Sequence, residues 1–182
     1  MQKAPTEKVA AAAPKAPRLV PQRVMLQPAD LGGAVPGPVE DGFAWPLLPQ
    51  PCADTPAPRP VAGHSQAADY GDRFRVYENV VRYRGDGARS YVTELKAQLD
   101  RCGVGGGDNG FHPVAVDHLG PDMALFAGNY DEGDRYVGYF VAAAGHYVVV
   151  VIMSDARLGA ADLTILNDLG SAAIRRAGSA RR

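Results

Sequence analysis

The chain has 182 residues, and its 19 lysines and arginines nearly balance 20 aspartates and glutamates, so the formal net charge at pH 7 is −1. A nearly neutral chain has no overall field that would attract nucleic acid or an anionic membrane surface, so we expect neither as a direct partner. No stretch reaches the roughly 18 apolar residues that a bilayer-spanning helix needs, and no signal-peptide core follows Met1. We therefore expect either a cytosolic protein or a targeting segment and anchor outside this sequence.

The first 23 residues differ in composition from the rest of the chain. Residues 1–23 are rich in alanine, proline and lysine, with prolines at positions 5, 14, 17 and 21, and predict a disordered tether. Residues 24–177 are expected to form one domain, with residues 178–182 as a basic tail. Within the domain, VMLQPADLGG at 24–33 predicts a proline-initiated helical turn closed by glycine.

Residues 49–70 contain many prolines and predict an irregular crossing. Trp45, just before it, is expected to anchor the core. The segment GHSQA at 63–67 resembles the nucleophile elbow of hydrolases, but the prolines before it exclude a central parallel strand. We interpret GHSQA as a polar turn. Cys52 and Cys102 are too far apart for a C-x-x-C motif, which leaves a disulfide or two unrelated thiols.

The segment DRFRVYENVVRYR, residues 72–84, is typical of a strand because it is rich in β-branched and aromatic residues. Tyr77 and Val81 fall on one face, whereas Val76 and Val80 fall on the other. This pattern favours cover on both faces or a bulge.

An amphipathic helix is predicted over 88–102, because apolar residues recur at steps of three and four. The glycine-rich stretch that follows, residues 103–110, contains G-x-G-x-x-G. In a dinucleotide site such glycines follow a strand and open a helix, whereas here they end one. We interpret them as a helix stop and a surface link.

The C-terminal half predicts a four-stranded antiparallel meander, since four strand-like runs are separated by short glycine-bearing turns. The last run, HYVVVVIM, is apolar on both faces and is expected at the centre of the sheet. A final helix turns Leu163, Leu166 and Leu169 inward. The sequence thus predicts an α+β fold: an antiparallel sheet of about five strands packed by two long helices, both on one face. The four runs are 111–118, 123–130, 135–142 and 146–153.

The order of these features resembles a known group. The segments DLGG…DGFAWPLLPQPC, VYENVVRYRGDGARSYVTELKAQLDRC and HYVVVVIM, followed by a final helix, resemble actinobacterial extracytoplasmic lipoproteins and sensor-like domains. The chain is similar, over about residues 24–177, to the extracellular sensor domain of PknH-type receptor kinases. In that group cysteines tie the helix to neighbouring segments, which implies a disulfide between Cys102 and Cys52. The resemblance implies ligand sensing or envelope association and no catalytic residues.

We therefore expect a non-enzymatic extracytoplasmic ligand-binding or sensor-like domain, membrane-tethered or secreted, without cofactor or bound metal. Its expected partner is a small apolar or amphiphilic envelope molecule, or an envelope protein. Strand tyrosines suit the wall of a half-open pocket, and we place Tyr77, Tyr83 and Tyr139 there. The alternative is that these rings only pack within the fold.

Two other functions stay open from the sequence. One is a small enzyme that uses His118 with Asp117 or Asp122 as an acid–base pair. The other is a cytosolic interaction module with two free thiols. The acidic turn at 131–134 lacks the EF-hand calcium pattern and is interpreted as a solvated hairpin tip.

Overall fold

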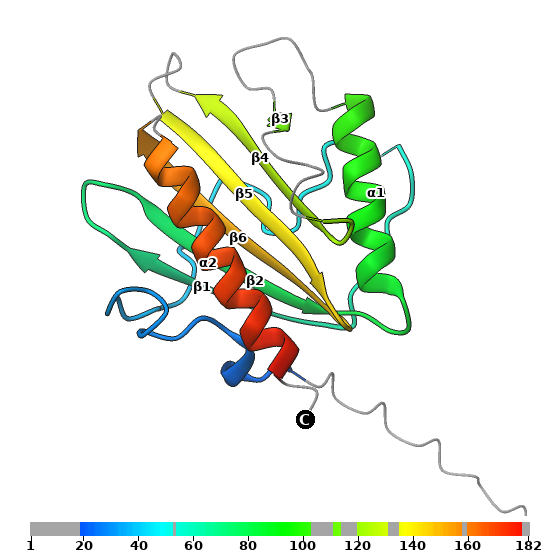
Figure 1. The fold of residues 1–182 in the computed structure, drawn as a ribbon, viewed down its shortest axis with the longest axis horizontal. Coiled ribbons are helices and arrows are strands. Elements are labelled where there is room, and N and C mark those ends of the chain that lie inside the picture. The colour runs from blue at the N-terminus through cyan, green and yellow to red at the C-terminus, as the bar shows by residue number, and fades with distance from the viewer. Residues whose placement is uncertain are drawn as a thin grey trace, which may run out of the picture.

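The computed structural model describes residues 19–52, 54–102, 111–113, 120–130, 135–157 and 160–179. These residues form an α+β fold in which a six-stranded antiparallel sheet is packed by two helices (Figure 1). This confirms the predicted fold class. The strands are β1 (Ala62–Asp69), β2 (Arg75–Arg82), β3 (Phe111–Pro113), β4 (Met123–Tyr130), β5 (Arg135–Ala144) and β6 (Tyr147–Arg157). The helices are α1 (Gly87–Cys102), α2 (Ala160–Ser179) and the short 3-10 helix η1 (Gln22–Val24).

The sheet has the order β1-β2-β6-β5-β4-β3, and each neighbouring pair is antiparallel. Strands β3 to β6 form the predicted meander. Strand β6 lies inside the sheet between β5 and β2, as its apolar residues on both faces predicted. Strand β2 is buried on both faces, and the register between β5 and β6 shifts at Tyr136 and Gly138. The cover on both faces that the β2 sequence favoured is therefore confirmed.

Strand β1 was not predicted. Its residues Ala62–Asp69 pair with β2 along their whole length, so the polar turn expected at 63–67 is wrong. The strand consists of small and polar residues and lacks the β-branched signal on which sequence reasoning depends. It forms because β2 offers a complete row of backbone hydrogen-bonding partners, and an edge position tolerates such a composition. The Ser65 hydroxyl donates a hydrogen bond to Asn79 Oδ1 at 3.0 Å.

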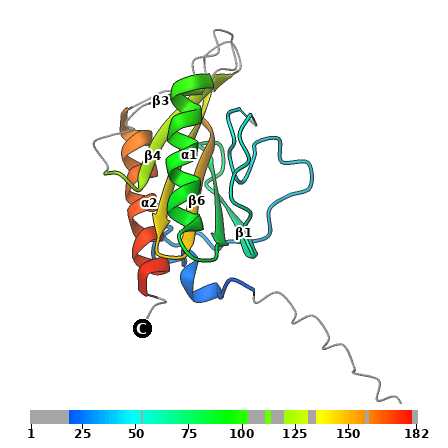
Figure 2. The ribbon, with the colours of Figure 1, turned by 90° about the vertical axis from the view of Figure 1, so that its right-hand side faces the viewer.

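The two helices pack on opposite faces of the sheet, which corrects the expectation that both lie on one face. Side chains alternate along a strand, so Phe140 faces the core beneath α2, whereas Tyr139 faces the core beneath α1. The central strands are apolar on both sides and therefore need cover on both sides. Figure 2, seen along the sheet, shows α2 on one side and residues 39–57 (light blue to cyan) on the other.

Segments without regular structure complete both layers. Residues 19–38 pack on the α2 face, where Val20 is 2% exposed and η1 contacts α2. The packed body therefore includes residues 19–23, which the sequence had assigned to the tether; residues 1–18 lie outside the described part. Helix α2 runs to Ser179, two residues into the expected basic tail.

Candidate functional site

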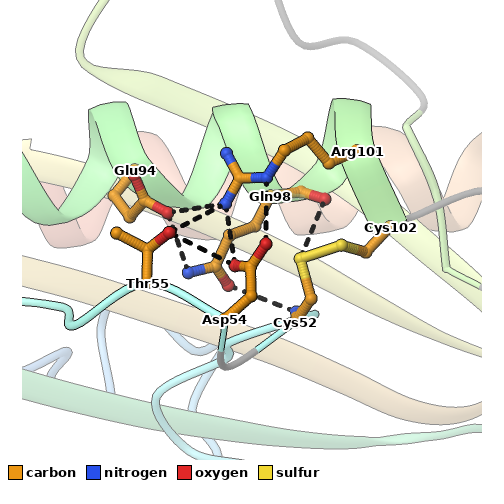
Figure 3. Close-up of a disulfide and its surroundings, with 7 residues drawn as sticks. All are labelled: Cys52, Asp54, Thr55, Glu94, Gln98, Arg101 and Cys102. Carbon is orange, nitrogen blue, oxygen red and sulfur yellow. Dashed lines mark hydrogen bonds and ion pairs between the residues drawn. A yellow bond between two sulfur atoms is a disulfide. The ribbon is translucent and has the colours of Figure 1, made fainter.

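Two regions of the molecule offer groups for function. The first consists of residues 39–52 and 54–57, called the strap below, which cross the α1 face. The disulfide between Cys52 and Cys102 joins it to the last residue of α1, with 5.8 Å between the two Cα atoms (Figure 3). The predicted disulfide is thus present, and the alternative of two free thiols is wrong.

A polar cluster surrounds this disulfide (Figure 3). The Arg101 guanidinium donates to both carboxylate oxygens of Asp54, at 2.9 and 3.3 Å, and to Glu94 Oε1 at 2.9 Å. These hydrogen bonds from Arg101 lower the pKa of both carboxyls. The sulfurs of Cys52 and Cys102 lie within 4.8 Å of an Asp54 oxygen, a spacing suited to a metal ion. Because the two sulfurs are bonded to each other, they are not thiolate ligands for a metal. The hydrogen bonds of Arg101 with Asp54 therefore act beside the disulfide as a second connection between the strap and α1.

Side chains of the sheet and α1 hold the rest of the strap. Tyr139, Asn79 and Tyr91 donate hydrogen bonds to the strap carbonyls of Pro46, Leu47 and Pro49, at 3.2, 2.8 and 2.6 Å. Proline has no N–H and cannot pair as a central strand, so the strap carbonyls depend on these side chains. Trp45, expected as a core anchor, is half-buried and packs against this face.

The structure brings the three predicted pocket tyrosines onto this same face and covers them. Tyr77, Tyr83 and Tyr139 are 1%, 3% and 0% exposed. The Tyr77 ring stacks on Phe43 at 3.8 Å between ring centroids, and its hydroxyl donates to Glu40. The rings of Tyr77 and Tyr139 therefore contact the strap, whereas the Tyr83 ring packs against Tyr91 of α1. A ligand pocket at these tyrosines would require this cover to move and stays a prediction.

The predicted acid–base group is described only in part. His118 and Asp117 lie outside the described residues, as do the acidic turn at 131–134 and the glycine-rich stretch 103–110. Asp122 is described, and its carboxylate lies 3.1 Å from Arg89 Nε. Both side chains line a polar cavity of about 610 Å³ beside the N-terminus of α1.

The second region is a surface cavity of about 480 Å³ between α2, the turn at 28–33 and the loop that joins β1 to β2; we call it the α2 cavity. Its floor is apolar, and four charged side chains stand at its rim. Helix α2 contributes one face, because its lining residues recur at steps of three and four. The apolar residues are Ala29, Leu31, Tyr70, Phe74, Ile165, Leu169 and Ala172, and the charged ones are Asp30, Arg73, Asp168 and Arg175.

The wall formed by the turn is fixed by hydrogen bonds. Backbone bonds from Leu31 N to Gln27 O and from Gly33 N to Pro28 O, at 3.2 and 2.8 Å, close the predicted helical turn. Gly32 and Gly33 have φ angles of +62° and +96°, a conformation that favours glycine. The Tyr70 hydroxyl donates to Leu31 O at 2.9 Å and ties the turn to the opposite wall.

Asp30 joins the same turn to α2. Its carboxylate accepts hydrogen bonds from Gln27 N at 2.9 Å and from Arg176 Nε at 2.8 Å. Burial acts to raise the pKa of Asp30, but these hydrogen bonds and the charges of Arg176 and Arg175 outweigh it, so the pKa is lowered. The carboxylate is therefore held ionised at neutral pH.

Sequence reasoning missed the α2 cavity because its walls come from three segments far apart in the chain. None of these segments carries a motif by itself. The nearest signal was the helical turn at 24–33, which was predicted without a partner. Only the packing of this turn against α2 and the β1–β2 loop creates the hollow.

In comparisons with known proteins, no family model matches this chain, and no curated protein is significantly similar to it. Among the described residues, none of the helices combines the length and the apolar character that crossing a bilayer demands.

Proposed function

We propose that this protein is a non-enzymatic, extracytoplasmic ligand-binding or sensor-like domain of the cell envelope, and that its ligand binds in the α2 cavity. The observation that carries the proposal is the cavity of about 480 Å³ with an apolar floor and a charged rim. Small-molecule sites have volumes of roughly 300–1,000 Å³ and combine apolar walls with a few placed polar groups. The α2 cavity has both properties.

The location rests on two supports. A disulfide is stable in oxidising compartments and rare in the cytosol, so the Cys52–Cys102 bond is compatible with a position outside the cytoplasm. The resemblance to actinobacterial sensor-like domains and lipoproteins favours the same position.

The alternative is an enzyme with an acid–base pair of His118 with Asp117 or Asp122. The ion pair between Asp122 and Arg89 favours the binding proposal over this alternative.

The proposal is tested by thermal-shift measurements on the oxidised chain with a panel of fatty acids, lysophospholipids and peptidoglycan fragments. The matched control is Ala29→Trp, because Ala29 lines the cavity and is exposed, so a large ring there fills the hollow without disturbing the core. A compound that stabilises the wild type and not Ala29→Trp supports the proposal. Hits that stabilise both proteins equally would place the ligand elsewhere and contradict it.

A further inference from the structure

We infer that the α2 cavity is selective for single-chain amphiphiles with an anionic head group, which pairs with Arg73 and Arg175. The inference rests on the proposed function and specifies its ligand class. It is carried by the charges at the rim, by the apolar floor between them and by the fixed wall of the turn.

The rim has two arginines that are available to a ligand. Among the described residues, neither Arg73 nor Arg175 forms a salt bridge, and both are exposed. The Arg73 guanidinium lies 5.1 Å from the centre of the Phe74 ring, which places its charge at the edge of the apolar floor. A head group bound there would therefore leave its chain in contact with the floor.

The rim carboxylates cancel these charges only in part. Asp30 is already engaged by Arg176 Nε at 2.8 Å and by Gln27 N at 2.9 Å. Asp168 precedes Arg175 by seven residues on α2, and two helical turns correspond to ~10 Å. With Asp30 paired to Arg176, the lining arginines Arg73 and Arg175 stand against one remaining carboxylate, Asp168. Guanidinium groups bind carboxylates and phosphates through paired hydrogen bonds.

The floor fits an alkyl chain. Tyr70, Phe74 and Leu169 form an aromatic and aliphatic surface, continued by Ile165 along the helix. The hydrophobic effect favours transfer of each methylene group onto such a surface. A single chain matches a cavity of about 480 Å³ that stays open to solvent on one side.

The site is preformed. Three hydrogen bonds hold the turn that forms one wall of the cavity. The Tyr70 hydroxyl donates to Leu31 O, and Arg176 Nε donates to the Asp30 carboxylate. Just before the turn, Leu26 N donates to the buried Glu78 carboxylate. A site fixed in this way loses little conformational freedom when a ligand binds.

The test uses three amphiphiles with the same twelve-carbon chain and different heads: dodecanoate, dodecyltrimethylammonium and dodecyl maltoside. Each is titrated below its micelle concentration by isothermal calorimetry at low ionic strength. We expect dodecanoate to bind about tenfold more tightly than either of the others, and its affinity to fall as salt is added.

Variants assign the selectivity to named residues. Arg73→Gln and Arg175→Gln should each weaken dodecanoate binding about threefold, and the double variant about tenfold. Arg84→Gln is the matched control, since Arg84 is exposed and does not line this cavity; it should bind like the wild type. Ala29→Trp should abolish binding.

The outcomes separate the two proposals. Equal binding of all three amphiphiles, lost in Ala29→Trp, would overturn the charge selectivity and leave the cavity as a ligand site. Dodecanoate binding that survives Ala29→Trp, or equal binding to anionic vesicles by both proteins, would overturn the site and with it the proposed function. Binding by none of the amphiphiles overturns this inference, while a hit of another class in the thermal-shift panel would keep the proposed function.

Discussion

The backbone N–H of Leu26 donates to both oxygens of the buried Glu78 carboxylate, at 2.9 and 3.1 Å. Gln66 completes the arrangement, because its Nε2 donates to Glu78 Oε2 at 2.7 Å and to Leu26 O at 2.8 Å. Glu78 is 2% exposed and lies on β2, and Gln66 lies opposite it on β1. This network joins the N-terminal segment to the edge of the sheet next to the α2 cavity.

The first prediction concerns the pH dependence of stability. Burial raises the pKa of Glu78 from 4.5 to about 8, although the hydrogen bonds from Leu26 and Gln66 act in the opposite direction. Between these two values the native protein binds a proton that the unfolded chain releases. The free energy of unfolding should therefore fall as pH rises from 4.5 to about 8, by at most ~1.4 kcal/mol per pH unit.

The measurement is urea unfolding of the wild type and Glu78→Gln across this pH range. Gln cannot titrate, so the variant should lose most of the pH dependence that the wild type shows. Equal slopes in the two proteins would show that Glu78 does not take up a proton on folding.

The second prediction concerns the disulfide. Replacing both Cys52 and Cys102 by serine should lower the free energy of unfolding by up to about 4 kcal/mol, because the bond closes a loop with a sequence separation of 50 residues. Chemical denaturation measures the loss, and reduction of the wild type should reproduce it. Mass spectrometry after alkylation of the unreduced, denatured protein checks the bond itself: two alkylated thiols would contradict it.

The third prediction uses two glycines of α2 as a matched pair. A Cβ atom at Gly170 would lie 2.3 Å from the Phe140 ring, whereas one at Gly178 would have no neighbour within 4 Å. Gly170→Ala should destabilise the protein by about 2 kcal/mol, since a packed core does not admit the added methyl group. Gly178→Ala should stabilise it by up to ~1 kcal/mol through helix propensity. Thermal unfolding compares them, and a stabilising Gly170→Ala would mean that α2 lies farther from β5.

The fourth prediction concerns Tyr83. Its buried hydroxyl has no hydrogen-bond partner among the described residues, and burial raises its pKa well above the usual range. An unpartnered buried hydroxyl costs about 1–3 kcal/mol, so Tyr83→Phe should raise the free energy of unfolding by about 1 kcal/mol. Tyr91→Phe is the control: it removes the 2.6 Å hydrogen bond to Pro49 O and should lower stability. Destabilisation by Tyr83→Phe would indicate a bound partner at this hydroxyl.

Local patterns were sufficient for much of the fold. Helix α1 follows from the spacing of Ala88, Tyr91 and Leu95, all of which are buried. The meander and the central place of β6 follow from short turns and from a strand that is apolar on both faces. These signals are reliable because each depends on residues close together in the chain, where periodicity reports directly which side is buried.

The candidate site was less accessible to sequence reasoning. The pairing of Cys52 with Cys102 came from a family resemblance, since spacing alone left two free thiols open. Tyr77 and Tyr139 were placed correctly on strands, and Tyr83 directly follows β2, but the exposure of these rings depended on where α1 and the strap cross the sheet. That crossing is set by contacts such as Tyr91 with Pro49 O, between residues 42 positions apart in the sequence.

By itself, the sequence determined the two long helices, strand β2 and the meander, and which faces of these elements are apolar. Only the tertiary structure decided that α1 and α2 lie on opposite faces, that β1 joins the edge of the sheet, and that the turn at 28–33 meets α2 to form a cavity. The physical reason is that an apolar face requires burial without specifying its partner. Burial is non-directional, so the partner is selected by the packing of the whole chain.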